Sequence, residues 1–242
     1  MAINKLKLAG LILVLLISGC IRKDELTRPV RVNLNIGIAP GEASSRPEYF
    51  YFNWAHIGIS RIEFTGKREA GGDVFFETSD SPGNQAIEFS EGKELLTSLD
   101  LPQGIYNPMR WDIHLRGMAT SGLIGYDAQG SGLVVWAIYE YPDGSVIPVF
   151  LCIDDSEIFS FKTYGPDLDS EIALSESQTF NVILQFDLYS AFWPVSRESI
   201  ESAENSVDLY GKPVIIISSS KNKALYQNLL FRISLSARAL VC

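Results

Sequence analysis

Residues 105–116 read IYNPMRWDIHLR, and this stretch decides the fold because its apolar and polar side chains alternate. The apolar set is Ile105, Met109, Trp111, Ile113 and Leu115, and the polar set is Arg110, Asp112, His114 and Arg116. A period of two is typical of a strand with one face in the core and the other in solvent. We therefore predict that Trp111 is buried and that His114 is exposed.

The same alternation recurs along the chain and predicts many strands. It is clearest in residues 30–38, 180–188 and 231–239, and β-rich runs occur at 56–64, 73–77, 122–128, 133–141, 146–153, 157–164 and 213–218. The turn Tyr141-Pro142-Asp143-Gly144 separates two of these runs, as in a hairpin. Half-buried strands joined by hairpins indicate an all-β fold, and we predict an antiparallel β-sandwich.

Helix signals are few. Ser196 is a suitable N-cap, with Glu198 in the first turn, so we expect one short helix there. Residues 93–99, KELLTSL, are expected to form another turn or two of helix.

The N-terminal residues have the layout of a secretory signal peptide. Lys5 and Lys7 precede an unbroken apolar run over residues 8–17, which is too short to cross a bilayer as a helix. Ile17-Ser18-Gly19-Cys20 resembles the bacterial lipobox, in which the cysteine is acylated after cleavage before it. Two or three acyl chains would hold the protein stably on a membrane. The alternative is an ordinary signal peptide with an incidental cysteine.

The residues after Cys20 bear on which membrane carries the protein. Ile21 stands where an aspartate retains lipoproteins at the inner membrane of well-studied enterobacteria, so the resemblance implies the outer membrane, on its periplasmic face or at the cell surface. Residues 23–25, Lys-Asp-Glu, also resemble a short surface-export tag; a solvated tether is the alternative.

The net charge and the cysteine content bear on which molecules the protein binds and on whether it forms a disulfide. The 242 residues carry a net charge of −9, and removal of residues 1–19 would make the chain more acidic still. A chain this acidic, with no basic stripe in its sequence, is a poor nucleic-acid binder. Cys152 and Cys242 are the thiols beyond Cys20, and we predict that they form a disulfide in the exported chain. The competing picture buries Cys152 as a small hydrophobe and leaves Cys242 at the terminus.

Three landmarks together resemble a bacterial lipoprotein domain family of unknown function. They are the strand ending Ile38-Ala39-Pro40 followed by AHIGISRIEF, the turn and strand Leu101-Pro102-x-Gly104-x-Tyr106-x-x-x-Arg110, and Phe186-Asp187-Leu188 followed by Leu209-Tyr210-x-Lys212-Pro213-Val214-Ile215. The resemblance implies a transthyretin-like or immunoglobulin-like sandwich and no particular reaction. It divides the chain into a signal peptide (1–19), a lipidated tether (20–29) and a single domain (30–242) with an insertion at about 117–145.

Catalytic and metal motifs are not evident in the sequence. His56 and His114 lack metal-site spacing, and there is no nucleophile elbow or phosphate-binding glycine loop, so we expect no enzymatic activity, metal or cofactor. The polar row of residues 110–116 could form a site, but a salt-bridged solvent face explains it better. Asp167-x-Asp169-x-Glu171, considered together with Asp154 and Asp155, lacks the glycine and the final glutamate of a helix-loop-helix calcium loop. A looser calcium loop is the alternative to a solvated turn.

The aromatic run at residues 49–54, YFYFNW, is the most suggestive segment for a ligand. If it is extended, Phe50, Phe52 and Trp54 share one face, and Tyr49 and Tyr51 share the other. Core packing is the ordinary explanation for such residues. A glycan platform formed by Tyr49, Tyr51 and Trp193 is the alternative.

These observations predict a lipid-anchored envelope protein with a non-catalytic domain that serves binding or structure. One alternative is a glycan-binding accessory lipoprotein. Another is a fimbrial or adhesin-type subunit that assembles by strand exchange through its alternating C-terminal segment. A membrane lipid anchor, a glycan and a protein are thus the expected partners.

Replacing the lipobox cysteine tests the anchor. Cys20→Ala should block acylation and cleavage, leaving a longer precursor that retains its signal sequence. Electrophoresis and membrane fractionation measure both effects. A membrane-bound product of normal mature size would contradict the lipobox interpretation.

Overall fold

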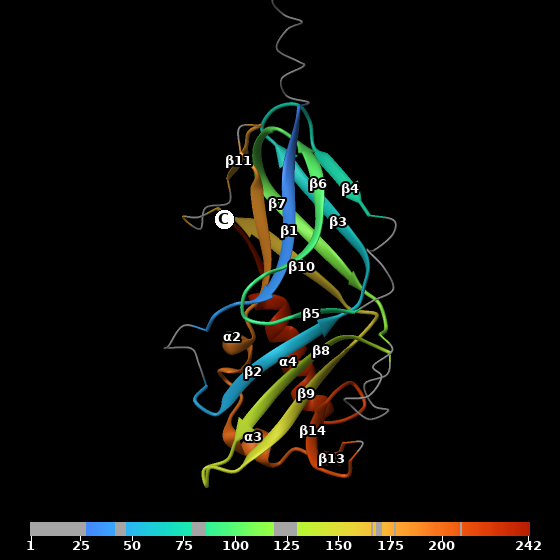
Figure 1. Cartoon of the computed structure of the whole chain (residues 1–242), viewed down its shortest axis with the longest axis vertical. Coiled ribbons are helices and arrows are strands. Elements are labelled where there is room, and N and C mark those ends of the chain that lie inside the picture. Colours follow the sequence, from blue (N-terminus) through green and yellow to red (C-terminus); the bar gives the residue numbers. More distant parts are fainter. Residues whose placement is uncertain are drawn as a thin grey trace, which may run out of the picture.

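The structure is a computed structural model that describes residues 28–41, 47–78, 86–118, 130–165, 167, 171–176, 178–208 and 210–242. Within these residues the strands form two sheets, one of nine strands and one of six. Figure 1 shows the two sheets in opposite halves of an elongated molecule. The protein is therefore mostly β, as the alternation predicts.

The nine-stranded sheet lies in the half where the described chain begins (Figure 1). Its order is β4-β3-β7-β10-β15-β12-β1-β6, and β11 pairs with β7. The bounds are β1 (Pro29–Ile38), β3 (Ile59–Arg68), β4 (Val74–Glu77), β6 (Glu94–Pro102), β7 (Gly104–Leu115), β10 (Ile158–Tyr164), β11 (Ile172–Leu174), β12 (Phe180–Phe186) and β15 (Arg238–Val241). The sheet curls into a nearly closed, barrel-like layer.

The six-stranded sheet has the order β13-β14-β9-β8-β2-β5. Its strands are β2 (Phe50–Ile57), β5 (Ile87–Phe89), β8 (Ser131–Glu140), β9 (Val146–Asp154), β13 (Asn205–Val207) and β14 (Pro213–Ile217), and the helices are α2 (Leu188–Phe192), α3 (Arg197–Glu201) and α4 (Lys223–Ser236). Phe52 of β2 packs against Tyr189 and Phe192 with ring centroids 4.9 and 5.0 Å away, so α2 covers the inner face of this sheet.

Strand β7 has the predicted facing from Met109 to Leu115, but at its start Tyr106 is buried in place of Ile105. Trp111 is fully buried, and its indole Nε1 donates a hydrogen bond to Thr163 Oγ1 at 3.0 Å, so the ring enters the core without an unpaired donor. His114 lies on the opposite face, but only 19 % of its side-chain surface is exposed to solvent, because charged neighbours surround it. The prediction is confirmed for Trp111 and wrong for the exposure of His114.

A glycine corner connects the sheets. Strand β2 belongs to the six-stranded sheet and β3 to the nine-stranded sheet, and Gly58 alone separates them. Gly58 N donates to Gly132 O at 2.8 Å, and Gly58 O accepts from Arg116 N at 2.9 Å. A Cβ atom at this position would lie 2.3 Å from the Arg116 carbonyl oxygen. The strand can therefore turn from one sheet into the other only because residue 58 has no side chain.

The sheets are mixed, whereas the sequence predicted antiparallel pairing. β1 pairs with β12, β10 with β15, and β14 with β9 in parallel. Parallel neighbours need long crossover connections, which are hard to infer from local alternation. The helices supply some of these connections, since α4 leads from β14 to β15.

The predicted strand at 231–239 is wrong. Residues 223–236 form helix α4, and only Arg238–Val241 form a strand. Tyr226, Leu229 and Ile233 are buried at the i, i+3, i+7 spacing of a helix face, whereas Phe231 and Leu235 are 65 % and 71 % exposed. Alternating apolar residues therefore fall on opposite sides of a helix here.

The two helix predictions have different outcomes. Ser196 Oγ accepts a hydrogen bond from Ser199 N at 3.1 Å and caps α3, as predicted. Residues 94–102 form β6, so the helical turn expected at 93–99 is wrong. Long-range pairing with β1 outweighs the helical preference of that short segment.

Residues of both sheets share one hydrophobic core. The segment expected as an insertion, 117–145, contains β8, which lies between β9 and β2 in the six-stranded sheet. That part of the segment is thus integral to the fold. Residues 119–129 lie outside the described residues, as do the predicted strand at 122–128, the signal peptide and Cys20.

Adding a methyl group at the corner tests its role. Gly58→Ala should lower the free energy of unfolding by about 1–3 kcal/mol or more, because the Cβ would overlap a backbone oxygen that strand pairing holds in place. Thr65→Ala on the exposed face of β3 should change it by less than about 0.5 kcal/mol. Denaturant unfolding measures both, and equal values would contradict the steric argument.

Candidate functional site

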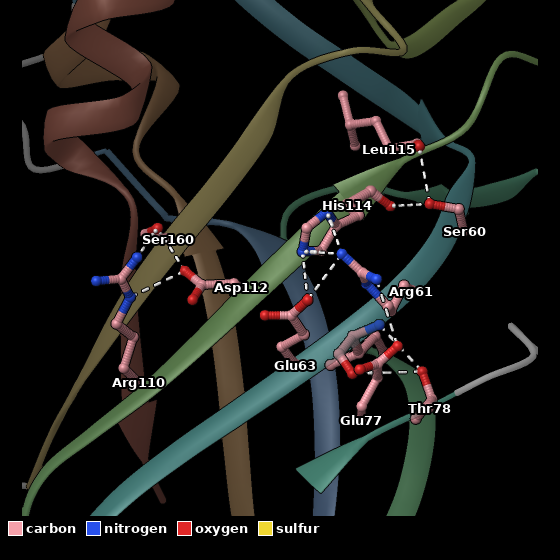
Figure 2. A network of polar contacts seen from close by, with 11 residues as sticks. Ser60, Arg61, Glu63, Glu77, Thr78, Arg110, Asp112, His114, Leu115 and Ser160 are labelled. Carbon is pink, nitrogen blue, oxygen red and sulfur yellow. Dashed lines mark hydrogen bonds and ion pairs between the residues drawn. The ribbon is translucent and has the colours of Figure 1, made fainter. Parts of the chain in front are cut away.

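A polar network covers the outer face of the nine-stranded sheet, around Arg61 of β3 (Figure 2). Arg61 Nη2 lies 2.8 Å from Glu63 Oε1, and Nη1 lies 3.3 Å from Glu77 Oε1. His114 Nε2 lies 3.0 Å from the same Glu63 oxygen. In the strand register Glu63 is directly opposite Glu77, and Arg61 is directly opposite His114. Like charges at such positions repel, and Arg61 offsets this because it pairs with Glu63 along β3 and with Glu77 on β4.

A second set of contacts extends the network across β7 to β10. Arg110 Nε lies 2.9 Å from Asp112 Oδ1, and Arg110 Nη2 donates to Ser160 Oγ at 2.9 Å. The Ser160 hydroxyl also donates to Asp112. Figure 2 shows the Arg110 side chain reaching over to Ser160 of the next strand.

This arrangement is better suited to stabilising the sheet than to chemistry. A Glu63–His114 pair could serve a general base, but Arg61 contacts both members and balances the glutamate charge. The described residues contain no group of three His, Cys, Asp or Glu side chains placed to hold a metal ion. Residues 110–114 thus contribute to a salt-bridged face, as the sequence favoured. Arg61 and Glu63 were missed, although the alternation of ISRIEF places them on a polar face.

Tyr49 is not an open ring platform. Its hydroxyl donates to Val195 O at 2.6 Å, and the Arg197 guanidinium lies over its ring, 4.5 Å from the centroid. Arg197 also lies 5.9 Å from the Tyr139 ring centroid, and Tyr139 OH donates to Glu201 Oε1 at 2.7 Å. Burial, with that hydrogen bond, raises the pKa of Tyr139 to about 12. The cluster therefore ties β8 to α3.

Tyr51 and Trp193 are exposed, but they do not share a face. Tyr51 is 49 % exposed on the outer face of the six-stranded sheet, with its hydroxyl 3.2 Å from Glu140 Oε2. Trp193 is 53 % exposed and follows α2, which covers the inner face of that sheet. The next residues, Pro194 and Val195, line a cavity of ≈ 450 Å³ with residues of α3 and α4. The structure therefore does not bring Tyr49, Tyr51 and Trp193 together as one site.

A different aromatic cluster lies beside Tyr51. Trp54 of β2 is directly opposite Trp136 of β8, with ring centroids 5.4 Å apart, and it stacks on His56 at 4.4 Å. His56 Nε2 lies 2.8 Å from Glu88 Oε2. We call Tyr51, Trp54, His56 and Trp136 the aromatic face.

Two features of the aromatic face were not evident from the sequence. The pairing register shifts between Phe52 and Trp54, so Trp54 turns away from the core face on which the alternation placed it with Phe50 and Phe52. Trp136 was missed because β8 carries apolar residues on both faces. Its Nε1 is buried and has no hydrogen-bond partner among the described residues.

The predicted disulfide is not formed. Cys152 is buried in β9 of the six-stranded sheet, whereas Cys242 is exposed and follows β15 of the nine-stranded sheet. Cys152 belongs to the outer cluster of the six-stranded sheet, with Val134 and Phe150, and not to the core that the two sheets share, so its side chain does not face β15. The competing picture, a buried Cys152 and a terminal Cys242, describes the structure.

The acidic segment at residues 167–171, expected as a solvated turn with a loose calcium loop as the alternative, is only partly described. Asp169 lies outside the described residues. Asp154 Oδ1 accepts a hydrogen bond from Ser219 Oγ at 3.0 Å, so one of its oxygens already has a partner.

In comparisons with known proteins, no family, no curated protein and no solved structure matches the chain. The resemblance to a lipoprotein domain family therefore stays a prediction. Within the described residues, no helix is both long enough and apolar enough to span a bilayer.

Proposed function

We propose that the protein is a lipoprotein, anchored through Cys20 in the outer membrane, whose β domain serves binding or structure and not catalysis. The lipobox at residues 17–20 and the abrupt change to charged residues after it support the anchor. The mutual pairing of Arg61, Glu63 and His114 supports a non-catalytic role, because the Arg61 guanidinium balances the charge of Glu63 beside the imidazole. The domain would be a sandwich-type member of the family that the landmarks resemble, with mixed sheets.

The position of β1 supports a definite orientation of the domain on the membrane. Pro29 opens β1 at one end of the long axis of the molecule, and the hairpin between β8 and β9 lies at the other end (Figure 1). Residues 20–28 can span at most about 30 Å when extended, so an anchor at Cys20 would hold the Pro29 end near the membrane. The six-stranded sheet would then project away from the lipid.

A glycan-binding role is the second candidate, and the aromatic face supports it. Tyr51 exposes about half of its surface beside two tryptophans, and His56, Glu88 and Glu140 supply hydrogen-bonding groups at the edge. Sugar rings are bound by stacking on aromatic side chains with polar groups around them, and the carboxylates favour a neutral glycan over an acidic one. The face belongs to the half that the anchor would leave accessible.

Strand exchange between subunits has less support. That alternative rested on a long C-terminal strand, and residues 223–236 form a helix instead. The four-residue β15 pairs with strands on both sides and is not at a sheet edge.

Fluorescence quenching in reconstituted vesicles tests the orientation. Reporter cysteines are introduced singly as Asp100→Cys, near the Pro29 end, or Asp143→Cys, in the distant hairpin, in a Cys242→Ser background. A lipid-headgroup quencher should reduce the fluorescence at position 100 more than at position 143. Cys152 is buried and should stay unlabelled in the folded protein. Equal or reversed quenching would contradict the proposed orientation.

Titration with a panel of neutral polysaccharides tests the glycan candidate. Tyr51→Ala and Trp54→Ala should each weaken binding by about tenfold, the effect of losing roughly 1.4 kcal/mol of stacking free energy. Trp193→Ala removes an equally exposed aromatic residue from the other side of the sheet and should leave affinity unchanged. Isothermal calorimetry gives the affinities, and equal losses in all three variants would argue against the aromatic face.

A further inference from the structure

Three cations lie side by side across the outer face of the nine-stranded sheet. Arg110 is opposite Lys162 in the pairing of β7 with β10, and Lys162 is opposite Arg238 in the pairing of β10 with β15. The row continues to Gln185 of β12 on one side and Thr65 of β3 on the other. We call Arg110, Lys162 and Arg238 the cationic row.

The three side chains share one face of the sheet. Their neighbours along the strands include the buried residues Met109, Trp111, Phe161, Thr163 and Ala239. The cations themselves must therefore point outward, since strand residues alternate between faces. Adjacent strands are about 4.8 Å apart, so the row spans roughly 10 Å.

This placement is costly for the isolated protein. Like charges at directly opposite cross-strand positions destabilise a sheet. Asp112 neutralises Arg110. Within the described residues, neither Lys162 nor Arg238 has an ion-pair partner. Lys162 Nζ lies over the Tyr164 ring, 5.3 Å from its centroid, and this contact does not neutralise its charge. The row and Asp112 together leave a local charge of about +2 on a chain whose total is −9.

Arg238 adds an independent sign of an incomplete site. Its Nε is buried from solvent and lacks a hydrogen-bond partner among the described residues. A buried donor without a partner costs free energy that an acceptor would recover. A turn of the guanidinium toward a bound oxygen would satisfy this donor and bring the charge into contact with the ligand.

We propose that the cationic row binds a divalent oxyanion of the phosphate type. Arg238 would offer a forked pair of donors to its oxygens, and Lys162 would supply a central point charge. Arg110 keeps Nη1 for the same ligand, while its Nε and Nη2 remain with Asp112 and Ser160. A charge of −2 balances the local charge and removes the cross-strand repulsion.

The row fits a single anionic group and not an extended polyanion. Its cations cover only about 10 Å, and Glu63 and Glu77 lie on the strands beyond β7. Along the row in the other direction the uncharged Gln185 follows Arg238. The anion could be free phosphate or a phosphate monoester of a lipid headgroup, which present the same oxygens. The site rests on the row alone and not on the function proposed above.

Nuclear magnetic resonance titration of the full chain in a non-ionic detergent tests the site. Inorganic phosphate and glycerol 3-phosphate are added in parallel, with chloride at matched ionic strength as the reference. The Arg238 Nε–Hε signal should shift with phosphate and not with chloride. Lys162→Gln and Arg238→Gln should each weaken phosphate binding by about tenfold, as expected for a charge-assisted contact.

Lys212→Gln is the matched control, because it removes the same charge from the turn before β14 in the other sheet. It should change the affinity less than twofold. Tighter binding of glycerol 3-phosphate would identify a headgroup as the source of the anion, and equal or weaker binding would identify free phosphate. In the absence of phosphate, the melting temperatures of Lys162→Gln and Arg238→Gln should be no lower than that of the wild type, because each substitution relieves the repulsion between neighbouring cations of the row. Equal phosphate affinity in the wild type and the row variants would overturn the proposal.

Discussion

The whole arrangement depends on a close backbone contact at Gly58. The residue exchanges hydrogen bonds with Gly132 and Arg116 at the place where the chain leaves one sheet and enters the other. Because backbone meets backbone there, the buried faces of both sheets can meet in one core. A second chain passage, from β9 to β10, joins the same two sheets. The polar and aromatic outer surfaces keep their positions because these passages fix the two sheets to each other.

The outer faces of the two sheets carry different kinds of side chain. The nine-stranded sheet covers its outside with paired charges such as Arg61 with Glu63 and Arg110 with Asp112. The six-stranded sheet has apolar residues on both faces, and its outer cluster includes Val134, Phe150 and Cys152, with Trp54 and Trp136 packed against it. Exposed charge is inexpensive on a solvated face, whereas an apolar outer face is more typical of a surface that contacts a partner.

Local alternation was sufficient to predict most strands, because a period of two reports directly which side chains enter the core. It failed where a second interpretation fits the same residues. Residues 229–235 alternate, but Leu229 and Ile233 also match a helix face, and only packing decides between the two. Trp54 was misplaced because a register shift adds a residue that no local pattern reveals.

The candidate sites depended even more on distant pairing. Arg110, Lys162 and Arg238 are widely separated in the sequence and become neighbours only through the order of β7, β10 and β15. Trp54 and Trp136 meet in the same way. The polar side of β7 was predictable by itself, since all of its members lie within one strand. To predict a row that crosses several strands, one must know the strand order and the pairing register. Local sequence patterns do not give either.

The position of β15 has a consequence for how the chain reaches its folded state. This strand comes after every other strand of its sheet in chain order, yet it lies between β10 and β12 and pairs with both. Until those residues have been synthesised, β10 and β12 have no strand between them, and the sheet remains in two pieces. Folding of this half is thus delayed until late in synthesis. Such a delay would suit the export that the lipobox predicts, because an exported chain passes through a narrow channel before it folds.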